Sequence, residues 1–206
     1  GKILYSGQPL SVDSEIQRLI SFYDKDQKKY LYPFAYIDPI TNEYFYENVP
    51  PGNYLISGII GEGHAIPGSF LFSGEIGKDA FALPGILRFD LTAKLYIHLL
   101  SPQDNSRDLC GDRPTLDMNS LSFEWEKVPM ADYYVVTIYE QKDPNTYSPV
   151  YEVNVKDSKL QFSLEGKTGG VKYMLYIIAN NSKNESIGVL AHHCKGSWGS
   201  YYFTLK

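Results

Sequence analysis

The sequence predicts an all-β protein made of two consecutive antiparallel β-sandwich domains. Tyrosine occurs 18 times in 206 residues and glycine 17 times, a composition suited to sheets and turns. Charged residues make up only 21% of the chain, which disfavours long surface helices. Apolar and polar residues alternate along short runs, and turn residues separate those runs. Because domains of about 100 residues are common, this length favours two domains over one.

Alternation with a period of two is clearest in the second half of the chain. Leu121, Phe123 and Trp125 share one face of a predicted strand, with polar residues between them. Further inward-facing sets are Tyr134, Val136 and Ile138; Tyr151, Val153 and Val155; Leu160, Phe162 and Leu164; Val171, Tyr173, Leu175, Ile177 and Ala179; and Tyr201, Phe203 and Leu205. With a first strand over residues 95–102, these make seven strands, which is the number expected of a sandwich.

The first half is less regular and leaves one local choice between helix and strand. Ser14 to Gln17 offers a helix-capping pattern, and Ile16, Leu19, Ile20 and Tyr23 have helical spacing. Ile20 and Phe22 before the turn Asp24-Lys25-Asp26 read equally well as a strand that enters a hairpin. We expect the strand.

The remaining elements of the first half are also expected to be strands and turns. Strands are predicted over residues 30–37, 44–46, 54–60 and 85–91, with an irregular glycine-rich loop over 61–77. In Pro50-Pro51-Gly52-Asn53-Tyr54, Pro51 presets φ and Gly52 supplies the positive φ of a type II turn, which predicts a hairpin anchored by Val49 and Tyr54. The junction between domains is placed near residues 92 to 94.

Two resemblances extend this interpretation. The segment Asn48-Val49-Pro50-Pro51-Gly52-Asn53-Tyr54 resembles the signature of carboxypeptidase-regulatory-like, or prealbumin-like, β-sandwich domains, which suggests such a domain over residues 1–93. Leu121 to Trp125, Ala131 to Ile138 and Tyr173 with Ala179-Asn180 resemble strands of a fibronectin type III domain, which suggests that family for residues 94–206. The long segments 103–119 and 182–196 depart from the second pattern.

The resemblances imply a secreted or cell-surface bacterial protein, or a fragment of one. Modules of both families serve as binding elements or spacers and are not typically catalytic, so we expect neither an enzyme nor a cofactor. A non-enzymatic binding or adhesion protein for a protein or polysaccharide is the first hypothesis. A structural spacer within a larger secreted hydrolase or surface assembly is the second. An enzyme, the third, would require a polar cleft with convergent titratable groups.

Charge and hydropathy exclude several classes of partner. The net charge is -5, and the sequence has no basic stripe, so nucleic-acid binding is not expected. No apolar run reaches the roughly 20 residues of a membrane-spanning helix. The start at Gly1 is compatible with removal of a leader or of an upstream lipid anchor, as in a lipoprotein. We expect a monomer.

Cysteine and histidine offer little chemistry. Cys110 and Cys194 are either bridged or two separate buried thiols. His192-His193-Cys194 is the one cluster of metal-ligand types, but on an extended segment only His192 and Cys194 point the same way, so no metal site is expected.

The most informative candidate site is the reverse of the inward-facing sets. If Tyr134, Val136 and Ile138 face the core, then the side chains between them face outward, as do those of the neighbouring strands. These predicted partner-binding residues are Tyr133, Tyr139, Tyr176, Trp198 and Tyr202, with Val135, Thr137, Met174 and Ile178 between them. Aromatic and aliphatic side chains in such a field offer contact area at little entropic cost. The alternative is that the first domain or the 182–196 segment covers them.

Overall fold

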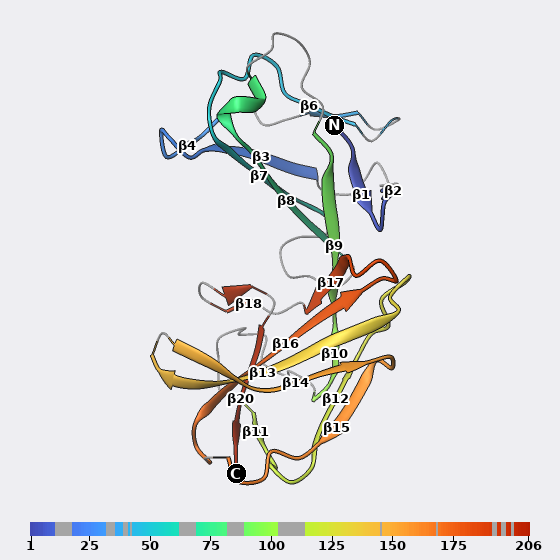
Figure 1. The fold of residues 1–206 in the computed structure, drawn as a ribbon, viewed down its shortest axis with the longest axis vertical. Helices are drawn as coiled ribbons and strands as arrows, with labels where there is room; N and C mark the ends of the chain where they lie inside the picture. The colour runs from blue at the N-terminus through green and yellow to red at the C-terminus, as the bar shows by residue number, and fades with distance from the viewer. Residues whose placement is uncertain are drawn as a thin grey trace. The chain divides into compact units, whose positions relative to one another are not determined.

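The protein is all-β in a computed structural model, and its described part forms two compact units (Figure 1). The structure describes residues 1–10, 18–31, 36–38, 41, 43–61, 69–81, 89–102, 114–144, 146–167, 169–190, 193–194, 197–198 and 200–206. Within these ranges the one helical element is the 3-10 turn η1 (Lys78–Phe81). The units divide between Lys94 and Leu95, within strand β9 (Leu91–Ile97). No helix in the described ranges could span a bilayer.

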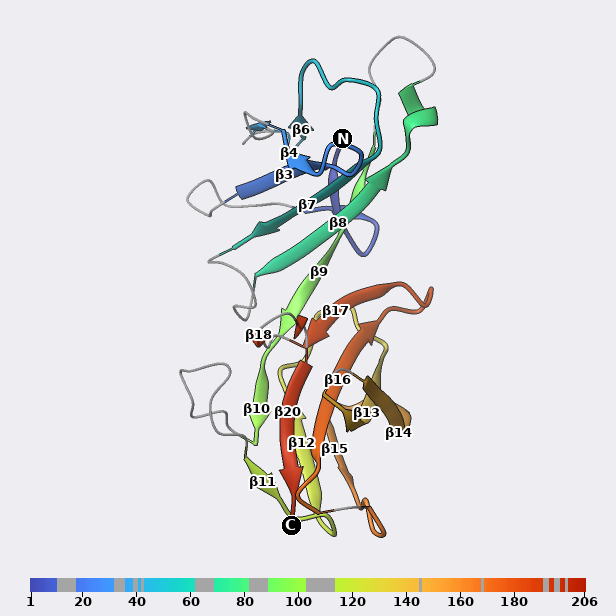
Figure 2. The same ribbon diagram turned by 90° about the vertical axis from the view of Figure 1, so that its left-hand side faces the viewer.

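The first unit is built on a sheet with the strand order β4-β3-β7-β8-β9. Strands β3 (Arg18–Asp24), β7 (Tyr54–Ile60) and β8 (Phe70–Ile76) are antiparallel and lie side by side in both ribbon views (Figure 2). Strand β4 (Lys29–Tyr30) pairs with the end of β3. The start of β9 pairs in parallel with β1 (Ile3–Tyr5), which also pairs with β2 (Gln8–Pro9).

Strand β3 confirms the choice of strand over helix for its residues. Ile20 and Phe22 are buried, whereas the alternate residues Ser21 and Tyr23 are only half-buried, which is the period of a strand. The predicted turn after it is also present. The Asp24 carboxylate accepts hydrogen bonds of 2.9 Å from the backbone N–H groups of Asp26 and Gln27.

The expected loop over residues 61–77 was wrong, because β8 occupies its second half. Phe72 and Ile76 of this strand are buried in the core. Gly74 suggested a loop, but it serves close packing instead, since a Cβ there would lie 2.6 Å from the Phe89 ring and 2.7 Å from the Leu91 side chain.

The Pro50 to Tyr54 segment does not close the predicted hairpin. Strand β6 (Tyr44–Phe45) pairs with β5 (Tyr36–Ile37), whereas β7 pairs with β3 and β8, so the segment connects two different sheets. Gly52 is not in the positive-φ region, and Asn48 takes that conformation instead, with φ of 57°. Gly52 leaves room for the Tyr54 side chain, since a Cβ there would lie 3.0 Å from the Tyr54 hydroxyl oxygen.

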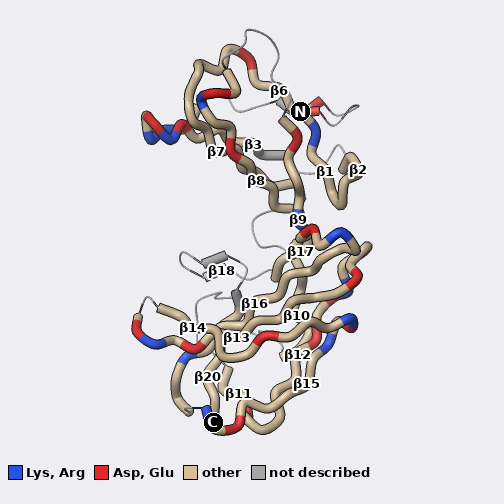
Figure 3. The backbone as a smooth tube through the Cα atoms, viewed as in Figure 1, with Lys and Arg blue, Asp and Glu red and all other residues tan. Residues whose placement is uncertain are grey.

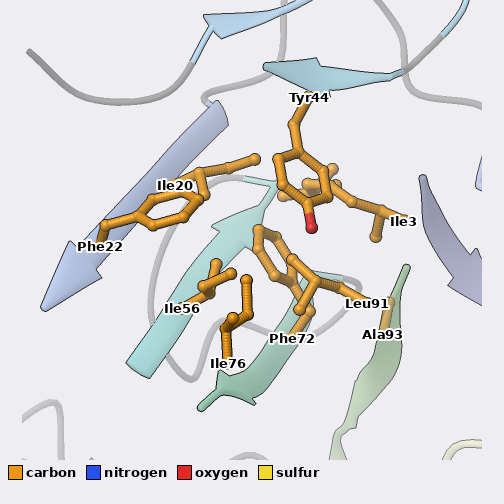
Figure 4. Packing of buried hydrophobic residues seen from close by; sticks show 10 residues of the cluster. Ile3, Ile20, Phe22, Tyr44, Ile56, Phe72, Ile76, Leu91 and Ala93 are labelled. Carbon is orange, nitrogen blue, oxygen red and sulfur yellow. The ribbon is translucent and has the colours of Figure 1, made fainter. Parts of the chain in front are cut away.

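The core of the first unit lies between strand β6 and the large sheet, which β1 joins through its pairing with β9 (Figure 4). Tyr44 reaches it from β6, and Leu91 and Ala93 reach it from β9. Each large apolar side chain removed from water here stabilises the fold by about 1.5–3 kcal/mol. The buried members are Ile3, Ile20, Phe22, Tyr44, Ile56, Ile60, Phe72, Ile76, Leu91 and Ala93.

The second unit contains two sheets whose alternating residues share a core. One sheet has the order β10 (Leu99–Ser101), β12 (Leu121–Trp125) and β15 (Lys159–Phe162). The other has β16 (Lys172–Asn180) at its centre, with β13 (Tyr133–Asp143) and then β14 (Thr146–Val155) on one edge. The other edge of β16 pairs with β20 (Ser200–Leu205) and β17 (Ser186–Leu190).

Smaller elements complete the second unit and make its sheets mixed. Strand β11 (Thr115–Leu116) pairs in parallel with β20, and β17 pairs in parallel with the end of β9. Strands β18 (His193–Cys194) and β19 (Ser197–Trp198) pair with each other. Strand β17 falls within the 182–196 segment that the sequence left unexplained.

Aromatic side chains from both sheets fill the core of the second unit. Trp125 meets Tyr134 edge to face, with ring centroids 5.3 Å apart, and Phe123 packs beside Phe203 at 5.6 Å. The Tyr134 hydroxyl oxygen accepts a 2.9 Å hydrogen bond from the backbone N–H of Val128. The predicted inward faces of β12, β13, β16 and β20 are therefore confirmed at these residues.

Candidate functional site

The reverse face of β13 and β16 is an apolar field that we call the outer face. It comprises Tyr133, Val135, Thr137 and Tyr139 from β13, and Met174, Tyr176 and Ile178 from β16. The strand register places Val135 opposite Ile178, Thr137 opposite Tyr176 and Tyr139 opposite Met174. Cross-strand neighbours at these positions lie close enough to pack directly.

The outer face is half-buried rather than fully exposed. Tyr133, Tyr139 and Tyr176 are all partly accessible, whereas Thr137 is only 4% exposed. The Thr137 hydroxyl donates a 3.3 Å hydrogen bond to the Glu152 carboxylate on β14, which covers it from the side. The three predicted tyrosines are therefore partly accessible to a partner, whereas Thr137 is not.

Charges are absent from the middle of the two strands and gather at their ends. Figure 3 shows β13 and β16 without charged residues along most of their length. Glu140, Lys142 and Asp143 end β13, and Lys172 begins β16. Lys142 and Glu140 pair with each other, with Nζ and Oε1 2.8 Å apart. A solvated sheet surface normally shows charge throughout, so this apolar stretch is unusual.

Tyr202 lies beside this face but is not available to a partner, which corrects its assignment as a contact residue. It pairs with Met174 and is only 7% exposed. The Lys172 ammonium lies 4.3 Å from the Tyr202 ring centroid, and the Tyr147 ring lies 6.1 Å from it. The lysine is held there by cation–π attraction and by its apolar stem, so these neighbours cover the ring.

The sequence suggested that Trp198 lies on the last strand, next to β16. The structure places it on β19 instead. The backbone of β19 pairs with β18, with Trp198 opposite His193, and the pairing of β20 to β16 ends at Ser200. The side chain of Trp198 falls outside the described part of the structure.

Tyr176 keeps its proton at physiological pH. Burial raises the pKa of the Tyr176 hydroxyl above its ordinary value, and the nearby Tyr139 hydroxyl raises it further. At Tyr176 the outer face therefore presents a neutral hydroxyl group, which can both donate and accept hydrogen bonds.

One end of the outer face opens into a hollow of about 660 Å³. Tyr133 forms part of it, and its hydroxyl donates a 2.9 Å hydrogen bond to Oδ1 of Asn184. The other lining residues, none of which was predicted, are Asp132, Asn154, Val155 and Lys156. In the sequence, the run of turn-forming residues Asn180-Asn181-Ser182 precedes Asn184 and is the signal that could have pointed to a polar loop at this end.

A second hollow, of about 880 Å³, lies in the first unit. Phe22, Tyr44 and Phe81 contribute to its apolar wall, and Phe45 at its edge is 48% exposed. The Tyr44 hydroxyl donates a hydrogen bond to the Phe89 carbonyl oxygen. Burial raises the pKa of the Tyr44 hydroxyl, and the negative charge of Asp90 raises it further. The aromatic run at residues 44–46 was the sequence signal for this hollow.

The remaining chemical candidates add no site. Where the chain is described, no cluster of three or more His, Cys, Asp or Glu side chains is placed to hold a metal ion. Cys110 and His192, together with the side chains of His193 and Cys194, lie outside the described residues. The choice between a disulfide and two thiols therefore stays a prediction.

Comparison with known proteins adds no relative. No protein-family model matches the sequence, and no curated protein matches it either.

Proposed function

We propose that the chain is a non-enzymatic binding protein of the cell surface or extracellular space, and that it engages a protein or polysaccharide through the outer face. The observation that carries the proposal is the half-exposed apolar surface of Tyr133, Tyr139 and Tyr176 on strands without charge in their middle. Tyrosine is favoured at interfaces because a large rigid ring ends in a polar group.

The order of the strands lends support to the resemblance behind this proposal. Three strands, β10-β12-β15, face four, β14-β13-β16-β20, with Tyr173 buried near the start of β16. An immunoglobulin-like sandwich divides its strands in this way. Such modules are used for binding or as spacers, so the binding experiment must separate these two roles.

Affinity electrophoresis through gels that contain single polysaccharides, together with surface binding to extracellular proteins, tests the proposal. The variant Tyr176→Ser removes a ring from the outer face, and Tyr30→Ser removes a ring that is 51% exposed in the first unit. Loss of a central aromatic contact costs about 2 kcal/mol or more, roughly a 30-fold weaker binding.

We expect the wild-type protein and Tyr30→Ser to bind at least one polysaccharide or protein, and Tyr176→Ser to bind it about 30-fold more weakly. Absence of binding above that of serum albumin would favour the spacer role instead. Equal binding by Tyr176→Ser and wild type would place the contact elsewhere on the chain.

A further inference from the structure

The hollow at the Tyr133 end of the outer face has the chemistry of a sugar site. We infer that it binds a neutral sugar unit of a polysaccharide, with the Tyr133 ring as the stacking surface. The inference rests on the proposed binding function and names its ligand class. A hollow of about 660 Å³ lies within the range of ligand pockets, which is about 300–1,000 Å³.

The side chains around the ring suit a ligand that carries many hydroxyl groups. Asn154 and Asn184 offer amides that both donate and accept, Asp132 accepts, and Lys156 donates. One carboxylate and one ammonium balance each other, so the hollow has no net formal charge to select an anion or a cation. Val155 is the one aliphatic residue in the lining, which leaves little for an apolar peptide side chain to fill.

The loop that carries Asn184 is fixed before any ligand arrives. The buried Asn181 side chain accepts 3.0 Å hydrogen bonds from the backbone N–H groups of Lys183 and Glu185, and its amide donates a 2.7 Å bond to the Glu185 carboxylate. Asn184 itself takes the left-handed conformation, with φ of 61°. A loop held in this way loses little entropy on binding.

The Tyr133 ring is fixed by the same loop. Its hydroxyl donates to Asn184 Oδ1 at 2.9 Å, and both residues line the hollow, where the amide nitrogen of Asn184 can donate to a ligand and the Tyr133 oxygen can accept from it. The Tyr133 ring lies on β13 and Asn154 on β14, Asp132 and Lys156 directly flank these strands, and Asn184 lies in the β16–β17 connection.

An array of neutral and acidic oligosaccharides tests the inference, with nitrogen-15 NMR titration of the tightest neutral binder. Tyr133→Ala removes the ring, and Tyr133→Phe keeps the ring but removes the bond to Asn184. Asn184→Gly removes the amide and keeps the backbone, because glycine adopts a positive φ without strain. Tyr30→Ala is the matched control, and circular dichroism checks that each variant folds.

We expect at least one neutral oligosaccharide to bind, with shifts at residues 132–133, 154–156 and 184. Tyr133→Ala should weaken binding about 10-fold or more and Asn184→Gly several-fold, whereas Tyr30→Ala should not change it. Tyr133→Phe should retain most of the affinity. Each of these results supports the sugar site.

Binding only of acidic oligosaccharides, or of none, overturns the inference. Neutral binding that Tyr133→Ala does not weaken overturns it as well. The proposed function fails separately: a neutral sugar bound at Tyr133 with no effect of Tyr176→Ser limits the contact to the hollow and excludes the part of the outer face around Tyr139 and Tyr176. If a protein ligand no longer binds Tyr176→Ser but still binds Tyr133→Ala, the proposed function is supported and the sugar site is overturned.

Discussion

The Tyr54 hydroxyl donates a 2.7 Å hydrogen bond to the carbonyl oxygen of Pro50, and the tyrosine ring lies against Gly52 between them. The proline-rich bend is therefore closed by the first side chain of β7 rather than by pairing between two strands. Asn53 in the same bend donates through Nδ2 to the Asp26 carboxylate at 3.1 Å and accepts from the Lys78 N–H at 3.0 Å. The motif thus fastens the β3–β4 turn and η1 to one end of the sheet.

Gly52→Ala should destabilise the first unit by about 1–3 kcal/mol, because the added methyl group meets the Tyr54 ring and hydroxyl within about 3.2 Å. Hydrogen exchange of the β7 amides, measured at increasing urea concentration, reports on the stability of the first unit. Tryptophan fluorescence would not, because both tryptophans of the chain lie in the second unit. In a Tyr54→Leu background the cost of Gly52→Ala should shrink. An equal cost in both backgrounds would show that the ring is not the cause.

Tyr134→Phe should destabilise the second unit by about 1–3 kcal/mol, since the Val128 N–H loses its buried acceptor. Urea unfolding followed by tryptophan fluorescence measures the effect, because Trp125 packs on the Tyr134 ring. Tyr133→Phe is the control: its hydroxyl bonds to an exposed asparagine, so the change should cost much less. Equal costs for the two variants would contradict the assigned bond.

Stability should fall as the pH rises past 10, because buried tyrosine hydroxyl groups must then ionise. Burial raises the pKa values of Tyr44, Tyr54, Tyr134 and Tyr176 above 10.0, so the folded protein holds these protons after the unfolded chain has released them. The stabilisation is complete below the unfolded pKa and is lost on approach to the folded one. Urea unfolding at several pH values, with tyrosinate absorbance recorded in parallel, tests this. A folded protein whose tyrosines all ionise near pH 10 would contradict it.

Lys172→Ala should expose the Tyr202 ring to solvent, because the ammonium 4.3 Å from its centroid and the lysine stem are removed. Nitration of tyrosine followed by peptide mass spectrometry should modify Tyr202 faster in the variant than in wild type. The lost cation–π contact should cost about 0.5–1 kcal/mol. Lys142→Ala, which removes an exposed lysine on β13, is the control and should leave nitration of Tyr202 unchanged. Unchanged nitration in Lys172→Ala would show that other groups bury the ring.

Sequence alone determined the elements whose apolar residues alternate with a fixed period. Leu121, Phe123 and Trp125, and likewise Tyr134, Val136 and Ile138, share the face that period two assigns to them, because a strand has only two faces. It also predicted which tyrosines of β13 and β16 point away from the core. The hairpin turn after Asp24 followed from local hydrogen bonding, which neighbouring residues alone provide.

Only the tertiary structure decided the features that depend on residues distant in sequence. Gly74 belongs to the glycine-rich stretch that predicted a loop, but it lies in β8, where the side chains of Phe89 and Leu91 pack closely against it. Tyr202 lies on a strand beside β16, as predicted, where it is opposite Met174, but Lys172 and Tyr147 cover its ring, which local alternation does not report. The hollow at Tyr133 draws Asn154 and Asn184 from two other segments. Alternation is a local property of the backbone, whereas burial and convergence are set by long-range packing.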